Sequence, residues 1–124
     1  MNMPVGIVFF AHGSSVGSAN AAVQVIAGQA AAQGDFALFT TAFLEMAQPD
    51  LAAAVEDLAA RGASTILVVP YFLTLGIHLQ RDLPRMVEEI QARHPGLPID
   101  VAPPLDGHPA LSTILVERAK AALA

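Results

Sequence analysis

The stretch "VVPYFLTLGIHLQRDLP", Val68–Pro84, decides how the rest of the sequence is read. It starts inside the apolar, β-branched run Thr65–Val69, which is typical of a buried strand and which we expect to end at Pro70. The segment that follows is almost entirely apolar, and it leads to a single histidine, His78. Connecting loops usually face water and are polar. An apolar loop with one histidine at its end therefore predicts the wall of a binding pocket.

The same alternation of apolar strand and amphipathic helix runs through the whole sequence. Strands are predicted at Val5–Phe10, Phe36–Leu44, Thr65–Val69 and Leu97–Ala102. Helices are predicted at Ala19–Gln33 with Gly34 as its stop, from Pro49-Asp50 to a stop at Gly62, at Arg81–His94 with Asp82 as N-cap and Pro84 in the first turn, and at Pro109–Leu123. Strict alternation predicts an α/β fold, a four-stranded parallel sheet with helices on both faces in a flavodoxin-like three-layer sandwich. Right-handed crossovers favour the strand order 2-1-3-4.

Length and composition narrow the class of protein. The 124 residues suit one domain, residues 1–124, and they contain no linker, repeat or low-complexity tract. Hydrophobic residues make up 54% and charged residues 14%, which indicates extra surface buried against a partner or around a ligand. The net charge of −5 argues against nucleic-acid binding, and the absence of cysteine excludes disulfides and thiolate metal sites. No signal peptide or membrane span is recognised, so we expect a cytoplasmic protein.

Three polar residues follow the first three predicted strands. Parallel α/β sheets bind ligands beyond the carboxyl ends of their strands, where the winding reverses. His12, Glu45 and His78 come after the first, second and third strands and should meet at this edge. Two imidazoles and a carboxylate suit a divalent first-row metal with open coordination positions. The same groups could transfer protons instead, and the two readings are compatible.

Each of these residues also has a purely structural interpretation. A histidine at a strand end is often a loop residue bonded to backbone, and Glu45 could simply precede a helix start. His94 is expected to be an exposed cation at a helix C-terminus, and His108 to lie just before the last helix.

Anion contacts are possible at a few further positions. Ser14 and Ser15 are either turn residues or anion contacts, and Arg81 and Arg85 are either a solvated helix turn or contacts to a polycarboxylate. The sequence has neither G-x-x-x-x-G-K-[ST] nor G-x-G-x-x-G after the first strand, which disfavours a nucleotide site. Ser14 has no G-x-S-x-G elbow around it, so a hydrolase nucleophile is also disfavoured.

Taken together, "AHGS", "AFLEMAQPDLAAAV", "VVPYFLTLGIHLQRDLP" and "LDGHPALSTILVERA" resemble the short CbiX/SirB-type chelatases. The resemblance runs from about Val5 to the end of the sequence. It implies insertion of Co²⁺, Fe²⁺ or Ni²⁺ into sirohydrochlorin without ATP, with cobalt our first choice. The family's H-G-S histidine matches His12, the glutamate of its F-L-E motif matches Glu45, and the histidine of P-x-F-L-x-x-G-x-H matches His78.

The resemblance also implies how the substrate is bound. Tyr71–Leu75 and Ile77 would lie against the macrocycle, and Gly76 would let the loop approach it closely. Ser14 and Arg81 would contact its acidic groups. The family's usual pattern is H-G-S-R, and this sequence has Ser15 at the fourth position, so one expected contact is missing. A single chelatase-like lobe implies a homodimer with the cleft between subunits.

Two other classes of protein are left open. The first is a metal or tetrapyrrole carrier without turnover, which a metal-insertion assay would separate from an enzyme. The second is a receiver-like or flavodoxin-like signalling module. A receiver has an acidic pair at the end of its first strand, where this sequence has His12, and bound FMN would make the protein yellow.

Overall fold

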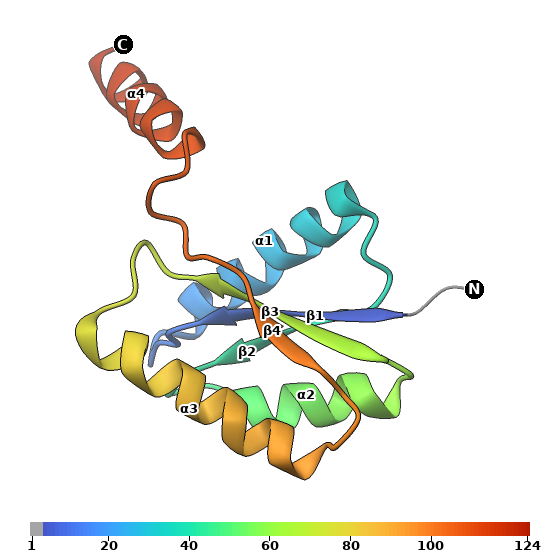
Figure 1. Ribbon diagram of the computed structural model, residues 1–124. Helices are drawn as coiled ribbons and strands as arrows, with labels where there is room; N and C mark the ends of the chain where they lie inside the picture. Colours follow the sequence, from blue (N-terminus) through green and yellow to red (C-terminus); the bar gives the residue numbers. More distant parts are fainter. Residues whose placement is uncertain (1–3) are drawn as a thin grey trace.

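The computed structural model describes residues 4–124, along which strands and helices alternate (Figure 1). The elements are β1 (Val5–Ala11), α1 (Gly17–Gly34), β2 (Phe39–Phe43), α2 (Leu51–Ala60), β3 (Thr65–Tyr71), α3 (Ile77–Arg93), β4 (Ile99–Val101) and α4 (Ala110–Leu123). The sheet is parallel and has the order β2-β1-β3-β4. The predicted fold class and strand order are confirmed.

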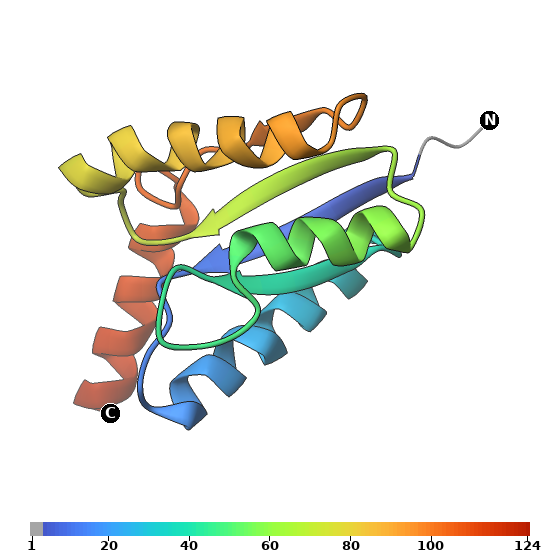
Figure 2. The ribbon, with the colours of Figure 1, turned by 90° about the horizontal axis from the view of Figure 1, so that it is seen from below.

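Helices pack against both faces of the sheet (Figure 2). On one face, Leu51, Ala54, Val55 and Leu58 of α2 and Leu83 and Ile90 of α3 form a core with Val8, Phe10, Ile66 and Val68 of the strands. On the other face, Ala27 and Ala31 of α1 pack against Ile7 and Phe9. Successive strand residues point to opposite faces, so each apolar strand serves both cores.

β1 is the strand around which the sheet is built. It pairs along Ile7–Ala11 with β2 and along its whole length with β3. Ala11 stands opposite both Phe43 and Tyr71, so β1, β2 and β3 end at the same level. The loops that follow these three strands therefore lie at one edge of the sheet.

α3 begins four residues earlier than predicted. Its N-cap is Gly76 rather than Asp82, and the Gln80 N–H already donates a helical bond to the Gly76 carbonyl (2.9 Å). The prediction placed Pro84 in the first turn because proline is best tolerated there. In the structure Pro84 lies inside the helix and leaves the Gln80 carbonyl without its usual donor. Gln80 is exposed, so water replaces that donor at little cost. His78 consequently lies in a helix and not in a loop.

β3 continues through Pro70 to Tyr71, whereas we expected it to end at Val69. Alternate residues of a strand direct their backbone groups to the same side. The Val68 carbonyl accepts from Ala102 N (2.8 Å) on the β4 side, so Pro70 has its nitrogen on that side too. β4 pairs only with Ile66–Val68, so no β4 carbonyl lies opposite Pro70. The missing N–H costs no ladder bond there.

Other element ends differ from the predictions by a few residues. α1 includes Gly34, and the left-handed C-cap is Asp35 (φ 56°). A Cβ at Gly34 would overlap the ring of Phe36, so the glycine is needed for packing rather than for the turn. Because Phe36 folds back in this way, β2 starts only at Phe39. β4 is likewise shorter than predicted. α2 begins at Leu51, directly after the predicted Pro49-Asp50 opening, and Asp50 is its N-cap, accepting from Ala53 N (2.9 Å).

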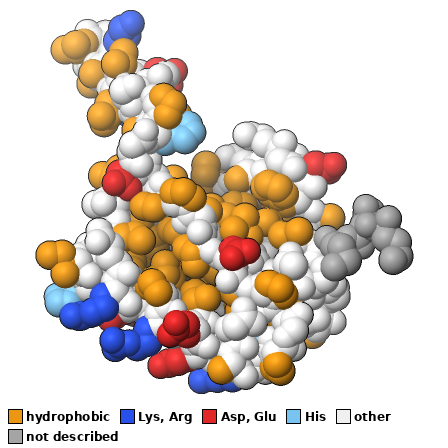
Figure 3. All heavy atoms as spheres, viewed as in Figure 1, with side chains coloured by type: hydrophobic (Ala, Val, Ile, Leu, Met, Phe, Trp, Pro, Cys, Tyr) orange, Lys and Arg blue, Asp and Glu red, His pale blue; other side chains and the backbone are white. Residues whose placement is uncertain are grey.

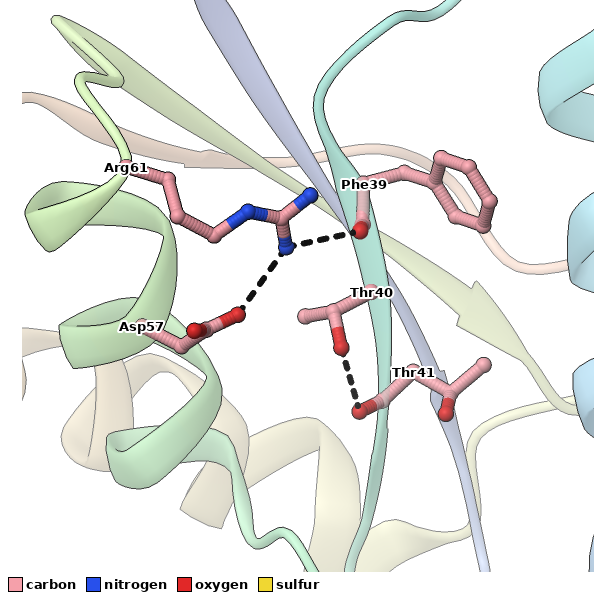
Figure 4. A network of polar contacts seen from close by, with 5 residues as sticks. All are labelled: Phe39, Thr40, Thr41, Asp57 and Arg61. Atoms are coloured by element: carbon pink, nitrogen blue, oxygen red, sulfur yellow. Dashed lines mark hydrogen bonds and ion pairs between the residues drawn. The ribbon is translucent and has the colours of Figure 1, made fainter.

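Arg61, at the end of α2, joins that helix to the outer strand β2 (Figure 4). One of its guanidinium nitrogens donates to the Phe39 carbonyl (3.3 Å) and to the Asp57 carboxylate (3.0 Å). Exposed ion pairs of this kind contribute little. The Phe39 contact does occupy one backbone acceptor on the free edge of the sheet.

α4 differs from the other helices because it stands away from the body (Figure 1). None of its residues, 110–123, is buried, and Leu115 is 70% exposed. In the described residues 4–124, no helix combines the length and apolar character needed to cross a membrane.

Leu58 tests the core between α2 and the sheet. Its side chain is fully buried among the strands, so Leu58→Ala should lower the free energy of unfolding by about 2–5 kcal/mol. Leu73, 67% exposed, is the matched control. Leu73→Ala should change the free energy of unfolding by less than about 0.5 kcal/mol. Urea unfolding measures both. Equal losses for the two variants would contradict the assigned core.

Candidate functional site

His12 and Glu45 are brought together by backbone pairing that continues past the strand ends. After β1 and β2 end, Leu44 N donates to the Ala11 carbonyl (2.9 Å) and Glu45 N donates to the His12 carbonyl (3.0 Å). The two side chains then meet, with His12 Nε2 2.9 Å from Glu45 Oε1. Both are more than half exposed, so the pair is open to solvent and to ligands.

Gly13 makes this close approach possible. Its φ is +90°, a conformation that residues with a Cβ rarely adopt, and a Cβ there would overlap the Glu45 carbonyl oxygen. The glycine of "HGS" therefore has a geometric role: it lets the chain turn immediately after His12 without pushing Glu45 away.

The partners of each imidazole indicate which nitrogen carries the proton. An ionised carboxylate only accepts, so His12 Nε2 donates to Glu45, which in the neutral ring leaves the lone pair on Nδ1. His78 Nδ1 lies 3.3 Å from a guanidinium nitrogen of Arg81, one turn further along α3. A guanidinium only donates, so Nδ1 of His78 is the acceptor and Nε2 holds the hydrogen of the neutral ring.

One cavity has both histidines on its wall. It has a volume of about 390 Å³ and is open to solvent. His12, Leu44, Phe72, Thr74, Gly76, Ile77, His78, Leu79, Asp82 and Met86 line it. Most of this wall is apolar. Across residues 4–124, however, no three His, Asp or Glu side chains lie close enough together to hold one metal ion. His12 and Glu45 form a pair, and His78 lies apart from them on the same cavity.

The remaining predicted binding residues do not all face this cavity. Ser14 is used to close the loop before α1: its backbone groups bond to the Asn20 side chain and its hydroxyl accepts from Val16 N. Tyr71 lines a different, apolar cavity beside α1. Leu75 is partly buried against the core under α3, and the side chain of Gln80 donates to its carbonyl.

Gly76 lines the cavity but does not need to be glycine for its backbone. Its φ is −66°, and no heavy atom lies within 4 Å of where a Cβ would be. Arg81 is exposed and is bonded to His78 and to Asp82.

The other two histidines have structural positions. His108 precedes α4 as predicted, and its Nδ1 accepts from Ala110 N (3.0 Å). His94 is the C-cap of α3, as the sequence indicates, but it is half-buried rather than exposed.

Two details of the site were not predicted: the contact of Phe72, part of the predicted Tyr71–Leu75 wall, with His12, and the exposure of Met46. Phe72 packs its ring edge-on against His12, with centroids 6.2 Å apart, and so limits how the imidazole can turn. Met46, 66% exposed with φ +65°, follows Glu45 directly. Leu73 and Ile77 are also strongly exposed, and Ile77 lines the cavity. The apolar segment after β3 indicated that some of its side chains line a pocket. Which of them contact His12 depends on the fold and could not be read from the sequence.

The model of the CbiX family matches residues 6–122, nearly the whole chain. The chain belongs to the CbiX family. A sirohydrochlorin cobaltochelatase from Methanopyrus kandleri is 32% identical over 96% of this chain and 97% of its own length.

Solved structures of CbiX and SirB proteins have the same fold. A cobalamin (vitamin B12) biosynthesis CbiX protein from Marinobacter aquaeolei superimposes with a TM-score of 0.84 and 31% identity, over 97% of this chain and 98% of the other. The sirohydrochlorin chelatase SirB from Bacillus subtilis, in complex with cobalt, has a TM-score of 0.76 and 26% identity, over 82% of this chain. That match spans only 44% of SirB, so this CbiX corresponds to about half of the longer protein.

The geometry at Gly13 predicts a large effect of adding one methyl group. Gly13→Ala should lower the free energy of unfolding by at least about 2 kcal/mol, because it combines an unfavourable φ with a clash against the Glu45 carbonyl. Gly17→Ala is the control, since a Cβ at Gly17 meets no atom within 4 Å. Denaturant unfolding of both variants measures the difference, and equal stabilities would contradict the turn described for Gly13.

Proposed function

We propose that this CbiX protein is a chelatase that inserts Co²⁺ into sirohydrochlorin without ATP. The observation that carries the proposal is one open, mainly apolar cavity with His12 and His78 on its wall and Glu45 bonded to His12. Family membership and the similarity to a cobaltochelatase of almost equal length support it. The divalent metal and the tetrapyrrole are both substrates, and no nucleotide is involved.

The His12–Glu45 pair is proposed to hold the incoming metal. Two ligand atoms about 2.1 Å from one ion, at right angles to each other, lie about 3.0 Å apart. The observed separation of 2.9 Å between Nε2 and Oε1 matches this arrangement. A divalent ion can therefore replace the shared proton with little movement of either side chain. Imidazole and carboxylate are suitable ligands for cobalt, iron and nickel alike.

His78 is proposed as the third ligand, made available by substrate binding. Its Nδ1 lone pair is occupied by Arg81 in the structure. Sirohydrochlorin carries several carboxylates, and a carboxylate is a stronger partner for a guanidinium than a neutral imidazole is. When Arg81 turns to a substrate carboxylate, His78 is free to bind the metal or to take a proton. Arg81 would also replace the contact that Ser15 cannot make.

The reaction exchanges one M²⁺ for two pyrrole protons, so the charge of the macrocycle does not change. The metal leaves its protein ligands as it binds the ring nitrogens. Each ligand that releases it regains a lone pair, and His12 and His78 then accept the two protons, with Glu45 as ligand or relay. The exposed apolar side chains of Met46, Leu73 and Ile77 provide a surface for the face of the macrocycle.

A homodimer is part of the proposal. This chain spans 44% of SirB, and a second copy would supply the other side of a cleft around the macrocycle. The strongly exposed apolar residues beside the site agree with such an arrangement. The cytoplasmic location stays a prediction from the sequence.

The deciding experiment is anaerobic metal insertion followed by absorbance. Purified protein, sirohydrochlorin and Co²⁺, Fe²⁺ or Ni²⁺ are mixed separately, and the spectral change is timed against a reaction without protein. We expect the largest acceleration with Co²⁺. Acceleration only with Fe²⁺ or Ni²⁺ would change the metal, and no acceleration by folded protein would favour a carrier.

His12→Ala and His78→Ala should each reduce the insertion rate by about 10²–10⁴-fold, since each removes a ligand and proton acceptor. His94→Ala is the matched control. His94 lies at the opposite end of α3, about 24 Å from His78 along the helix axis, and its loss should leave the rate unchanged. Circular dichroism checks that all three variants are folded. Full activity in both site variants would refute the assigned ligands.

Arg81→Gln separates substrate binding from chemistry. It should raise KM for sirohydrochlorin about tenfold, because a charge-assisted hydrogen bond to a substrate carboxylate is lost at an exposed site. Arg93→Gln, in the last turn of α3, is the control. Steady-state kinetics at saturating metal measure both constants. An unchanged KM in Arg81→Gln would rule out the carboxylate contact.

A further inference from the structure

α4 has an apolar side that none of the described residues 4–124 covers. Leu111, Leu115, Ala119 and Ala122 share one side of the helix by their spacing, and Leu115 is 70% exposed. Arg118 lies at the border of this side, between Leu111 and Ile114 around the helix. The opposite side carries Thr113, Glu117 and Lys120. A helix of this length is only marginally stable in water on its own, so its apolar side needs a packing partner.

One face of the sheet is covered by a single helix. α2 and α3 both cover the same face, and α1 alone covers the other. Doubly wound parallel sheets are covered on both faces, because their strands are apolar on both sides. β3 is incompletely covered on the α1 face: Leu67 and Val69 are only partly buried there, and Tyr71 is 42% exposed.

The uncovered part of this face forms an apolar groove. It has a volume of about 230 Å³, several times the roughly 30 Å³ of one water molecule. Val23, Ile26, Ala27 and Ala30 of α1, Phe9 of β1, Val69, Pro70 and Tyr71 of β3, and Leu105 line it. Figure 3 shows hydrophobic side chains gathered over this face, beside the protruding helix. No charged residue lines the groove, so a charged or strongly polar occupant is disfavoured.

The segment between β4 and α4 directs the helix away from its own groove. Leu105 N donates to the Phe72 carbonyl (3.2 Å), which holds this segment at the edge of the sheet. Pro103, Pro104 and Pro109 restrict the backbone around that contact. Folding α4 back onto its own sheet would require this stiff, anchored segment to reverse.

We infer that α4 packs in the groove between α1 and β3 of a second copy of this chain, and that α4 of the second copy packs in the same groove of the first. One side of the helix and the lining of the groove are both apolar, each lacks a partner among the described residues, and one chain provides both. Reciprocal exchange then supplies each sheet with a second helix on its α1 face in a closed, symmetric dimer. The inference specifies how the proposed dimer is held together, and does not depend on which metal is inserted.

The first test is the mass of the full chain in solution. Sedimentation equilibrium should give twice the chain mass of 12.9 kDa. Leu115→Glu on α4 and Ile26→Glu in the groove should each raise the dimer dissociation constant at least about 100-fold, because a charge in an apolar contact is left unpaired. Thr113→Glu is the matched control: it adds the same charge on the other side of α4 and should leave the dimer intact.

A cross-link shows whether the helix is exchanged. The sequence has no cysteine, so an Ile26→Cys chain and a tagged Leu115→Cys chain can be co-expressed and treated with a short bis-maleimide. Exchange predicts a covalent species that joins the tagged and untagged chains. Thr113→Cys in place of Leu115→Cys should give little of it. This result does not rely on a destabilising variant.

The outcomes separate this inference from the proposed function. A monomeric wild-type chain, a dimer that tolerates both glutamate substitutions, or absence of the mixed cross-link would overturn helix exchange. A monomer that still inserts cobalt would leave the chelatase proposal standing. An exchanged dimer that does not accelerate insertion of any metal would refute the chelatase proposal alone.

Discussion

The site depends on the pairing of β1 with its two neighbours. Because β1, β2 and β3 end at one level, each loop begins at the same edge of the sheet. The hydrogen bond from Glu45 N to the His12 carbonyl then extends the β1–β2 pairing by one more step, and Gly13 gives the chain room to turn away. The position of the imidazole beside the carboxylate is therefore fixed by backbone geometry and not by the exposed side chains themselves.

The sequence was sufficient to predict the fold and to select His12, Glu45 and His78, because parallel strands place successive loops at a common edge. It was not sufficient for details that depend on packing. Pro84 was read as a first-turn residue, which hid the helical position of His78. Tyr71 and Phe72 look alike in an apolar segment, yet one faces the groove beside α1 and the other faces His12, since adjacent residues point to opposite sides.

The protein has two exposed apolar surfaces, one near the strand ends and one beside α1, and they differ in the residues around them. Met46 and Leu73 are strongly exposed on the loops that follow β2 and β3, and Ile77 is strongly exposed at the start of α3. Within residues 4–124, the groove beside α1 has no charged lining, and it lies next to a helix none of whose residues is buried. Leu105 and Phe72, joined by a backbone hydrogen bond, connect the two regions, so the segment that directs α4 also contacts the wall of the histidine cavity.

Pro70 also affects how two such sheets can meet. Beyond Val68, β3 is an outer strand, and outer strands with free N–H groups invite other chains to add a strand. At Pro70 that edge offers no donor, so a continuous intermolecular sheet cannot be templated there. The end of β3 beyond β4 therefore resists the addition of strands from other chains that leads to fibres.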